Sequence, residues 1–260
     1  MGLKFDNAEN KQMLTQQSAQ TSYLMDDNGE YDRVLSASVT TWDNVFDVLD
    51  PVFGIQSGSS SLVNQNNVWR QKATYQFIGE GLNSETAGSG TPIATYQPLF
   101  SVDDWTDLDD SFLDENHPWL KNGEITLYDS YSHALEAKNE VSGQYAATKM
   151  TADQTKVMAT AMNSRYEEMA FSGAEQGLTD VNGVVILESN IRFSPLYSHS
   201  GVRHVVAHSG EVAFEYSFDV PEGAGTKKYR AMVWCYLPAQ AEAELDENSE
   251  LNLVSLTAEV

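Results

Sequence analysis

The residues best suited to bind an ion lie in an acidic run that begins at residue 103. Hard cations take oxygen ligands, so closely spaced carboxylates on a loop suit calcium, magnesium or, in brine, sodium or potassium. The spacing differs from the EF-hand loop, which needs Gly at its sixth position and Glu at its twelfth. A solvated acidic loop is the alternative interpretation. The candidate cation ligands are Asp103, Asp104, Asp107, Asp109 and Asp110.

Three histidines form an H-x4-H-x3-H series at His199, His204 and His208. If residues 202–208 form a strand, His204 and His208 lie on the same side about two pleats apart, which is too far to chelate one ion. A zinc site would need more ligands, and the sequence has neither a Cys cluster nor an H-E-x-x-H helix. We therefore expect surface or interface histidines.

The single cysteine, Cys235, has no partner for an internal disulfide. It lies in the apolar run 229–237 with no adjacent His, which suits a small core side chain better than a reactive thiolate. If a neighbouring chain covers that strand, Cys235 is a candidate for an intermolecular contact or disulfide.

Motifs for nucleophilic catalysis and for nucleotide binding are missing from the sequence. There is no G-x-S-x-G elbow and no P-loop, and Gly79-Glu80-Gly81 lacks the third glycine of a dinucleotide-binding turn. We therefore predict a protein that is not an enzyme and requires no cofactor. The alternative is a halophilic carbohydrate-binding module or hydrolase on a jelly-roll scaffold. Its aromatic cleft would be built from Trp69, Tyr75, Trp105 and Trp119.

The net charge of the chain indicates which classes of partner are disfavoured. Its 38 Asp and Glu against 15 Lys and Arg give a formal net charge of −23. Nucleic acid and anionic lipid are disfavoured, because both are bound through Lys and Arg. The acidic residues are dispersed, which is typical of a surface adapted to high salt; an ordinary acidic cytosolic protein is the alternative.

Membrane insertion and export are not expected. No stretch of about 18 apolar residues exists to span a bilayer. The start MGLKFDNAENKQ lacks the basic and apolar segments of a secretory signal. We expect synthesis in the cytoplasm without export.

The elements that must position these residues are mainly β-strands. Short β-branched and aromatic segments alternate with turn-forming clusters such as Asn122-Gly123, a pattern typical of a sandwich or barrel. In residues 211–220 every second side chain is apolar, which predicts one buried and one solvated face. Ser209-Gly210 predicts a hairpin between two of the strands. The nine predicted strands are 33–41, 68–78, 93–102, 124–131, 184–193, 202–208, 212–220, 229–237 and 251–258.

One helix is predicted between Thr151 and Phe171. Thr151 with Gln154 resembles a capping box, the methionines that follow fall at helical spacing, and Gly173 is a terminator. With a weaker helical run at 132–139, this predicts a mainly helical or irregular insertion at about 132–175.

The predicted domain organisation is an arm followed by one β-domain. Residues 1–30 are polar and rich in Gln and Asn, with scattered apolar positions, so we expect an extended N-terminal arm. Residues 31–260 then form a jelly-roll-like β-sandwich or barrel that carries the insertion. No linker long enough to separate independent domains is evident.

This combination of arm, strands, inserted helix and strand-like Leu251–Ala258 resembles a viral capsid β-barrel. With the acidic surface, it resembles the larger of the two major capsid proteins of membrane-containing icosahedral haloarchaeal viruses. These are the sphaerolipovirus type, built from vertical single jelly rolls. The resemblance covers roughly residues 31–260 by pattern.

The resemblance implies a structural virion protein that assembles an icosahedral shell. Its partners would be further copies of itself and a second, smaller capsid protein, close to an internal viral membrane and without direct contact to nucleic acid. The insertion at 132–175 or the acidic loop at 103–115 would belong to an outer tower, and Cys235 would meet a partner chain. A tail-tube or decoration protein of a haloarchaeal tailed virus is the alternative within this class.

Overall fold

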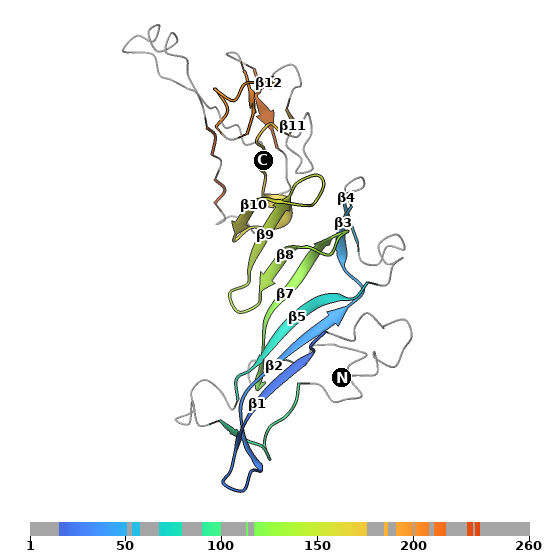
Figure 1. Ribbon diagram of the computed structural model, residues 1–260, viewed down its shortest axis with the longest axis vertical. Coiled ribbons are helices and arrows are strands. Elements are labelled where there is room, and N and C mark those ends of the chain that lie inside the picture. Colours follow the sequence, from blue (N-terminus) through green and yellow to red (C-terminus); the bar gives the residue numbers. More distant parts are fainter. Residues whose placement is uncertain are drawn as a thin grey trace, which may run out of the picture. The chain divides into compact units, whose positions relative to one another are not determined.

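The computed structural model divides the chain into two compact units, Met1–Phe171 and Ser172–Val260 (Figure 1). The residues that the structure describes are 16–50, 54–57, 68–79, 90–99, 113, 117–175, 185–186, 191–199, 201–207, 211–216, 228–230 and 232–234.

The described part of the first unit is a ten-stranded sheet, so the prediction of a mainly β protein is confirmed. Seven strands follow one another across the sheet in the order β1-β2-β5-β7-β8-β9-β10, as the blue-to-yellow succession in Figure 1 shows. These strands are β1 (Ala19–Met25), β2 (Tyr31–Asp43), β5 (Arg70–Phe77), β7 (Trp119–Asp129), β8 (Ala134–Asn139), β9 (Gln144–Met150) and β10 (Val157–Met162).

Three short strands attach to this path. β3 (Asp47–Asp50) pairs with β4 (Gly54–Gln56) and runs parallel to the end of β7, and β6 (Thr91–Pro92) pairs with β2. All other pairs in this sheet are antiparallel. The sheet is therefore largely a meander, and its described strands do not make the Greek-key crossings of a jelly roll.

A bulge in β2 sets which side chains face the core. Tyr23 pairs with Val34 while Ser22 pairs with Ser36, so Leu35 is an extra residue on β2. Side chains alternate along a strand, and one inserted residue changes the face that follows. Val34 before the bulge and Ala37 after it are consequently both buried although they are three residues apart, and Leu35 is half exposed.

The buried side chains of this unit form three separate clusters. The first lies over β2, β5 and the start of β7, and the second over β7 to β10. The third is centred on Phe46, Val48 and Tyr128. The first contains Val34, Ala37, Val39, Ala73, Tyr75, Phe77, Leu99 and Trp119. The second contains Leu127, Leu135, Ala147, Tyr166 and Met169.

The prediction of a helix between Thr151 and Phe171 is wrong. Residues 157–162 are strand β10, and the one helical element described in this stretch is the short 3-10 helix η3 (Tyr166–Glu168). Ala159 and Ala161 pack on the second cluster, whereas Thr160 and Met162 are exposed. This alternation has the two-residue period of a strand, and pairing with β9 overrode the helical spacing of the methionines.

The other helical prediction and part of the arm also need correction. Residues 134–139, within the weaker helical run, form β8 between β7 and β9. In the predicted arm, Ala19–Met25 is β1 and pairs along β2. Its apolar side chains are too few for a pattern, and the backbone hydrogen bonds to β2 order it instead. Residues 1–15 lie outside the described part.

Asn122-Gly123, predicted as a turn, lies inside β7. Gly123 pairs with Thr74 on one side and Asn139 on the other, and Asn122 sits at a register shift between β7 and β5. A Cβ atom on Gly123 would lie 2.9 Å from the carbonyl oxygen of Lys138. The glycine therefore permits a close approach of two strands at a bulge.

We expect the variant Gly123→Ala to lose about 1–3 kcal/mol of unfolding free energy, the usual cost of overpacking. The backbone of β8 must shift to accept the methyl group. Equilibrium urea unfolding in molar salt measures this loss. Gly29→Ala is the comparison for backbone strain without a clash, because nothing lies within 4 Å of its added Cβ while its φ is +80°, a left-handed value that Gly123 does not have. An unchanged midpoint for Gly123→Ala would contradict the close approach.

The described residues of the second unit contain two small antiparallel pairs. β11 (Val185–Ile186) pairs with β14 (Phe214–Glu215), and β12 (Ile191–Phe193) pairs with β13 (Arg203–Val205). The turn of the hairpin predicted at Ser209-Gly210 lies outside the described residues; among the described ones, β13 and β14 belong to different pairs. Local turn chemistry suggested the hairpin, but longer-range pairing decided the partners. The predicted strand 251–258 lies outside the described residues, as do residues 231 and 235–237 of the predicted strand 229–237. Residues 229–230 and 232–234 are described and do not form a strand.

Candidate functional site

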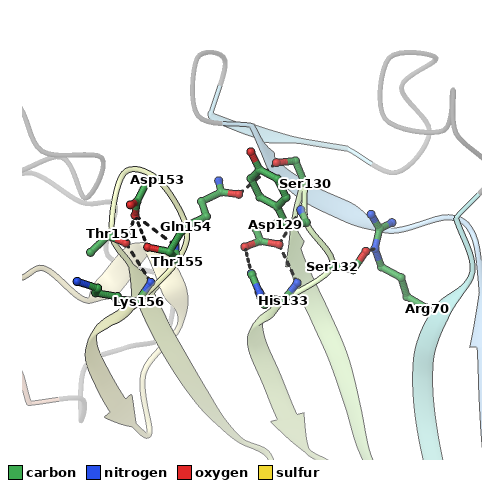
Figure 2. Close-up of polar contacts among 11 residues, drawn as sticks. Arg70, Asp129, Ser130, Ser132, His133, Thr151, Asp153, Gln154, Thr155 and Lys156 are labelled. Carbon is green, nitrogen blue, oxygen red and sulfur yellow. Dashed lines mark hydrogen bonds and ion pairs between the residues drawn. The ribbon is translucent and has the colours of Figure 1, made fainter.

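A network of polar side chains connects two turns at one end of the sheet in the first unit (Figure 2). One turn joins β7 to β8, and the other joins β9 to β10. Arg70 reaches the first turn from the start of β5. We define this network as the turn cluster. Its members are Arg70, Asp129, Ser130, Ser132, His133, Thr151, Asp153, Gln154, Thr155 and Lys156.

Asp129 is the centre of the β7–β8 turn and is fully buried. Its Oδ1 accepts hydrogen bonds from the backbone N–H of Tyr131 at 2.9 Å and of His133 at 2.7 Å. Its Oδ2 lies 2.7 Å from Nδ1 of His133. The backbone N–H of Asp129 also donates to the His133 carbonyl at 3.0 Å. An aspartate caps such a turn well, because its short side chain reaches backbone donors two and four residues ahead.

The two serines of this turn are held by other partners. Ser130 Oγ donates to Oε1 of Gln154 at 3.2 Å, which connects the two turns. Ser132 Oγ accepts from Nε of Arg70 at 2.9 Å. Ser132 and Gln154 both have positive φ, at 74° and 55°. Two non-glycine residues in the left-handed region indicate that the hydrogen bonds hold both turns in a costly conformation.

The β9–β10 turn is organised around Asp153. Its Oδ1 accepts from the hydroxyl of Thr151 and, at 2.9 Å, from the hydroxyl of Thr155. These bonds favour the ionised carboxylate, and they hold the pKa of Asp153 below its usual value. The Thr151 hydroxyl also accepts from the backbone N–H of Lys156 at 3.1 Å. Thr151 thus closes a turn between strands, although the sequence suggested a helix cap.

Tyr128 lies next to the turn cluster and beneath Arg70. Its hydroxyl donates to the carbonyl of Gln71 at 2.5 Å, and the Arg70 guanidinium lies 5.4 Å from its ring centroid. Burial raises the pKa of Tyr128 to about 12, although the positive charge of Arg70 partly opposes this. Burial also lowers the pKa of Arg70. The folded structure therefore keeps the Tyr128 hydroxyl protonated to a higher pH than a free tyrosine.

We expect the absorbance difference at 295 nm between the natural chain and Tyr128→Phe to titrate near pH 12, against about 10 for a free tyrosine. In the folded protein the Tyr128 hydroxyl stays protonated at pH values above its pKa in the unfolded chain. The stability that depends on Tyr128 is therefore fully present below pH 10 and is lost as the pH rises through 12. A difference spectrum with a midpoint near 10 would contradict the burial of this hydroxyl.

The Asp129–His133 pair has the geometry that orients an imidazole as a general base. A carboxylate on Nδ1 fixes the tautomer and leaves Nε2 for a reacting group. The His133 side chain is half exposed, so Nε2 has access to solvent. The two nearby serine hydroxyls bond to Gln154 and Arg70. The contacts of the Asp129 carboxylate with the two backbone amides and the imidazole stabilise the turn.

The site residues predicted from the sequence do not belong to the turn cluster. The proposed cation ligands Asp103, Asp104, Asp107, Asp109 and Asp110 lie outside the described residues, as do Cys235 and His208. His199 stacks on Trp234 with ring centroids 4.0 Å apart. His204 lies on β13 and its ring is 6.0 Å from that of Tyr197. Among the described residues, no group of three or more His, Cys, Asp or Glu side chains could hold a metal ion.

The aromatic cleft suggested for a carbohydrate-binding protein is not supported at two of its four positions. Tyr75 and Trp119 are both buried in the first core cluster. Trp69 is half-buried beside β5, and Trp105 lies outside the described part. A sugar cannot stack on rings that the core already covers.

Sequence reasoning did not identify the turn cluster. The signal was the short pattern Asp-Ser-Tyr-Ser-His at 129–133, in which an aspartate precedes two serines and a histidine. It has the composition of a turn, but only the pairing of β7 with β8 reveals that Asp129 is buried. Within the described residues, no helix is long and apolar enough to cross a membrane.

Comparisons with known proteins give no assignment. No protein-family model matches the chain, and neither the curated proteins nor the solved structures include a significant match.

Proposed function

We propose that this protein is a structural virion component, a major capsid protein that assembles the shell of a halophilic archaeal virus. The observation that supports this most is the long sheet of the first unit. In the described chain its outermost strands, β1 and β10, each pair on one side. Unpaired strand edges are templates for pairing with another chain, and monomeric proteins usually protect them with charges or proline.

Exposed apolar side chains add to this argument. Leu24, Met25 and Tyr31 are exposed where β1 meets β2, and Val157 and Met162 are exposed on β10. Large apolar side chains that gather on strands usually mark surfaces that are covered in an assembly. Neither β1 nor β10 contains a charged residue, although the chain has a net charge of −23. These edges are thus suited to contact neighbouring subunits.

The finer features predicted from the sequence belong to this proposal. They are a jelly-roll-like closure of the sheet, a second and smaller capsid protein as partner, and a cation in the acidic loop 103–115. A jelly-roll closure requires a Greek-key crossing between two packed sheets. A structure of the assembled protein tests this feature.

Electron microscopy of the purified protein in about 2 to 4 M salt, which screens its charge, tests the proposal. Capsomers or a curved lattice would support a shell protein. Rings or tubes would instead identify a tail-tube protein, the alternative that the open sheet edges also permit. A uniform monomer or dimer at every protein concentration would overturn the structural role.

We also expect the thermal midpoint to rise by about 5–10 °C between dilute buffer and 2 M sodium chloride, equivalent to about 2–3 kcal/mol for a chain of this size. Salt screens the repulsion among acidic side chains on the surface. Chloride is preferred to sulfate because sulfate also strengthens apolar burial. A flat response would contradict adaptation to high salt.

A further inference from the structure

The strand β10 (Val157–Met162) is an edge with unusual sequence symmetry. It pairs with β9 on one side, and the described chain supplies no strand for its other side. Residues 158–162 read Met-Ala-Thr-Ala-Met, which is a palindrome about Thr160. We propose that β10 pairs antiparallel with β10 of a second copy, about a two-fold axis at Thr160.

The palindrome makes this register self-complementary. In an antiparallel pair centred on Thr160, each residue faces the one at the mirrored position. Thr160 then lies opposite Thr160 of the second copy, Ala159 opposite Ala161, and Met158 opposite Met162. A two-fold interface requires the same patch on both subunits, so a palindromic strand matches itself without mismatched side chains. Threonine pairs and apolar pairs are favourable cross-strand neighbours.

The arrangement of side chains on β10 suits this contact. Ala159 and Ala161 pack toward the second core cluster, while Thr160 is exposed and Met162 is 89% exposed. Pairing would continue the sheet, bring Met162 against Met158 of the second copy, and remove this apolar side chain from water. The register with β9 shifts at Met158 and is regular from Ala159 to Met162, so the regular part of the outer edge is centred near Thr160.

The charge distribution favours a second copy at this edge. Two molecules that each carry a net charge of −23 repel one another. This repulsion is weakest where the contacting surfaces contain no acidic side chains. β10 has no charged residue, and the basic residues Lys156 and Arg165 flank it. The opposite edge, β1, is also uncharged, but two register shifts interrupt its pairing with β2, against one shift, at Met158, in the pairing of β10 with β9. Such irregular strands are poorer templates for regular pairing, which makes β10 the better candidate.

Disulfide trapping tests the register in the full chain with Cys235→Ala, which removes the single natural cysteine. Paired residues in antiparallel strands have Cα atoms about 4.5–5.5 Å apart, within the range that a disulfide spans. We expect Thr160→Cys to give a covalent dimer under mild oxidation. Met162→Cys alone should stay monomeric, because its counterpart in the second copy is about 13 Å away along the strand. Combining Met158→Cys with Met162→Cys should restore the covalent dimer.

A charge variant tests the same contact without a covalent bond. Thr160→Lys brings two like charges together on the two-fold axis, although it lowers the overall negative charge of each copy. We expect the dimer dissociation constant from analytical ultracentrifugation to rise at least about tenfold, equivalent to 1.4 kcal/mol. Ser22→Lys on β1 makes the same charge change at the other edge and should leave this constant unchanged.

The proposal fails if folded Thr160→Cys protein gives no covalent dimer, or if each single cysteine variant cross-links equally well. Circular dichroism verifies the fold of every variant. The pairing would be one contact of the proposed shell, but it does not depend on shell formation. A trapped dimer without shells would uphold the pairing and overturn the capsid function, and shells without the Thr160 cross-link would do the reverse.

Discussion

Replacing Trp119 by alanine is expected to lower the free energy of unfolding by about 3–5 kcal/mol. Trp119 is 2% exposed and lies in the first core cluster at the start of β7. Its ring is 5.3 Å from that of Phe77 and 6.4 Å from that of Tyr96, measured between centroids. Truncation leaves a cavity that the strands cannot close, because both neighbours are fixed in the sheet or against it.

The indole also makes a hydrogen bond that alanine cannot replace. Nε1 of Trp119 donates to the carbonyl of Gln97 at 2.9 Å, which anchors the segment after β6 to the sheet. The predicted loss is a large part of the 5–15 kcal/mol that a typical domain possesses. Equilibrium urea unfolding followed by far-ultraviolet circular dichroism, in molar salt, measures it without depending on tryptophan fluorescence.

Two variants separate the contributions. Trp119→Phe keeps an aromatic ring against Phe77 but loses the bond to Gln97, so we expect a loss of about 1–2 kcal/mol. Trp234→Ala removes a side chain that is 68% exposed in the second unit, and it should cost at most about 1 kcal/mol. Equal losses for Trp119→Ala and Trp234→Ala would contradict the assignment of Trp119 to the core.

The variant Asp129→Ala is expected to lower the free energy of unfolding by about 3 kcal/mol. The substitution removes the acceptor of two backbone N–H groups and of the His133 ring. A fully buried donor that loses its partner costs about 1–3 kcal/mol; these two amides are only partly buried, but both are lost together and the turn also contains Ser132 at a positive φ. Urea unfolding measures the total, and hydrogen exchange of the Tyr131 and His133 amides reports on the turn itself.

The variant His133→Ala is the matched control for Asp129→Ala. It removes the imidazole but leaves both backbone donors on the Asp129 carboxylate, so we expect a loss of about 1 kcal/mol or less. Asp129→Asn keeps an oxygen for the two amides and should fall between the alanine variants. If His133→Ala proved as destabilising as Asp129→Ala, the ring contact, rather than the capped backbone, would stabilise the turn.

The sequence by itself determined that this is a mainly β protein, and it did so where one face of a strand is buried. Ala73, Tyr75 and Phe77 alternate with polar residues on β5, and these three side chains are buried. On β2 and β7 the strands were also recognised, although their ends differ by several residues. A two-residue period is a local property, so it can be read without knowledge of the partner strands.

Local sequence patterns gave wrong predictions where one pattern is compatible with two different structures. The methionines after Thr151 satisfy a helical spacing, yet Val157–Met162 pairs with β9 and places its alanines on the core. Asn122-Gly123 has the chemistry of a turn, but in β7 the missing side chain admits a neighbouring carbonyl. In both cases hydrogen bonding to an adjacent strand of the sheet outweighed a local preference of about 1 kcal/mol or less per residue.

Only the tertiary structure decided which polar residues meet. Asp129, Gln154 and Arg70 come from three separate parts of the chain, and the order of strands in the sheet brings them to one end. Among the described strands it also leaves β10 at an edge of the sheet, which gives the palindrome around Thr160 its significance. Pairing order is fixed by the burial and hydrogen bonding of the whole sheet, whereas composition and alternation are properties of the chain alone.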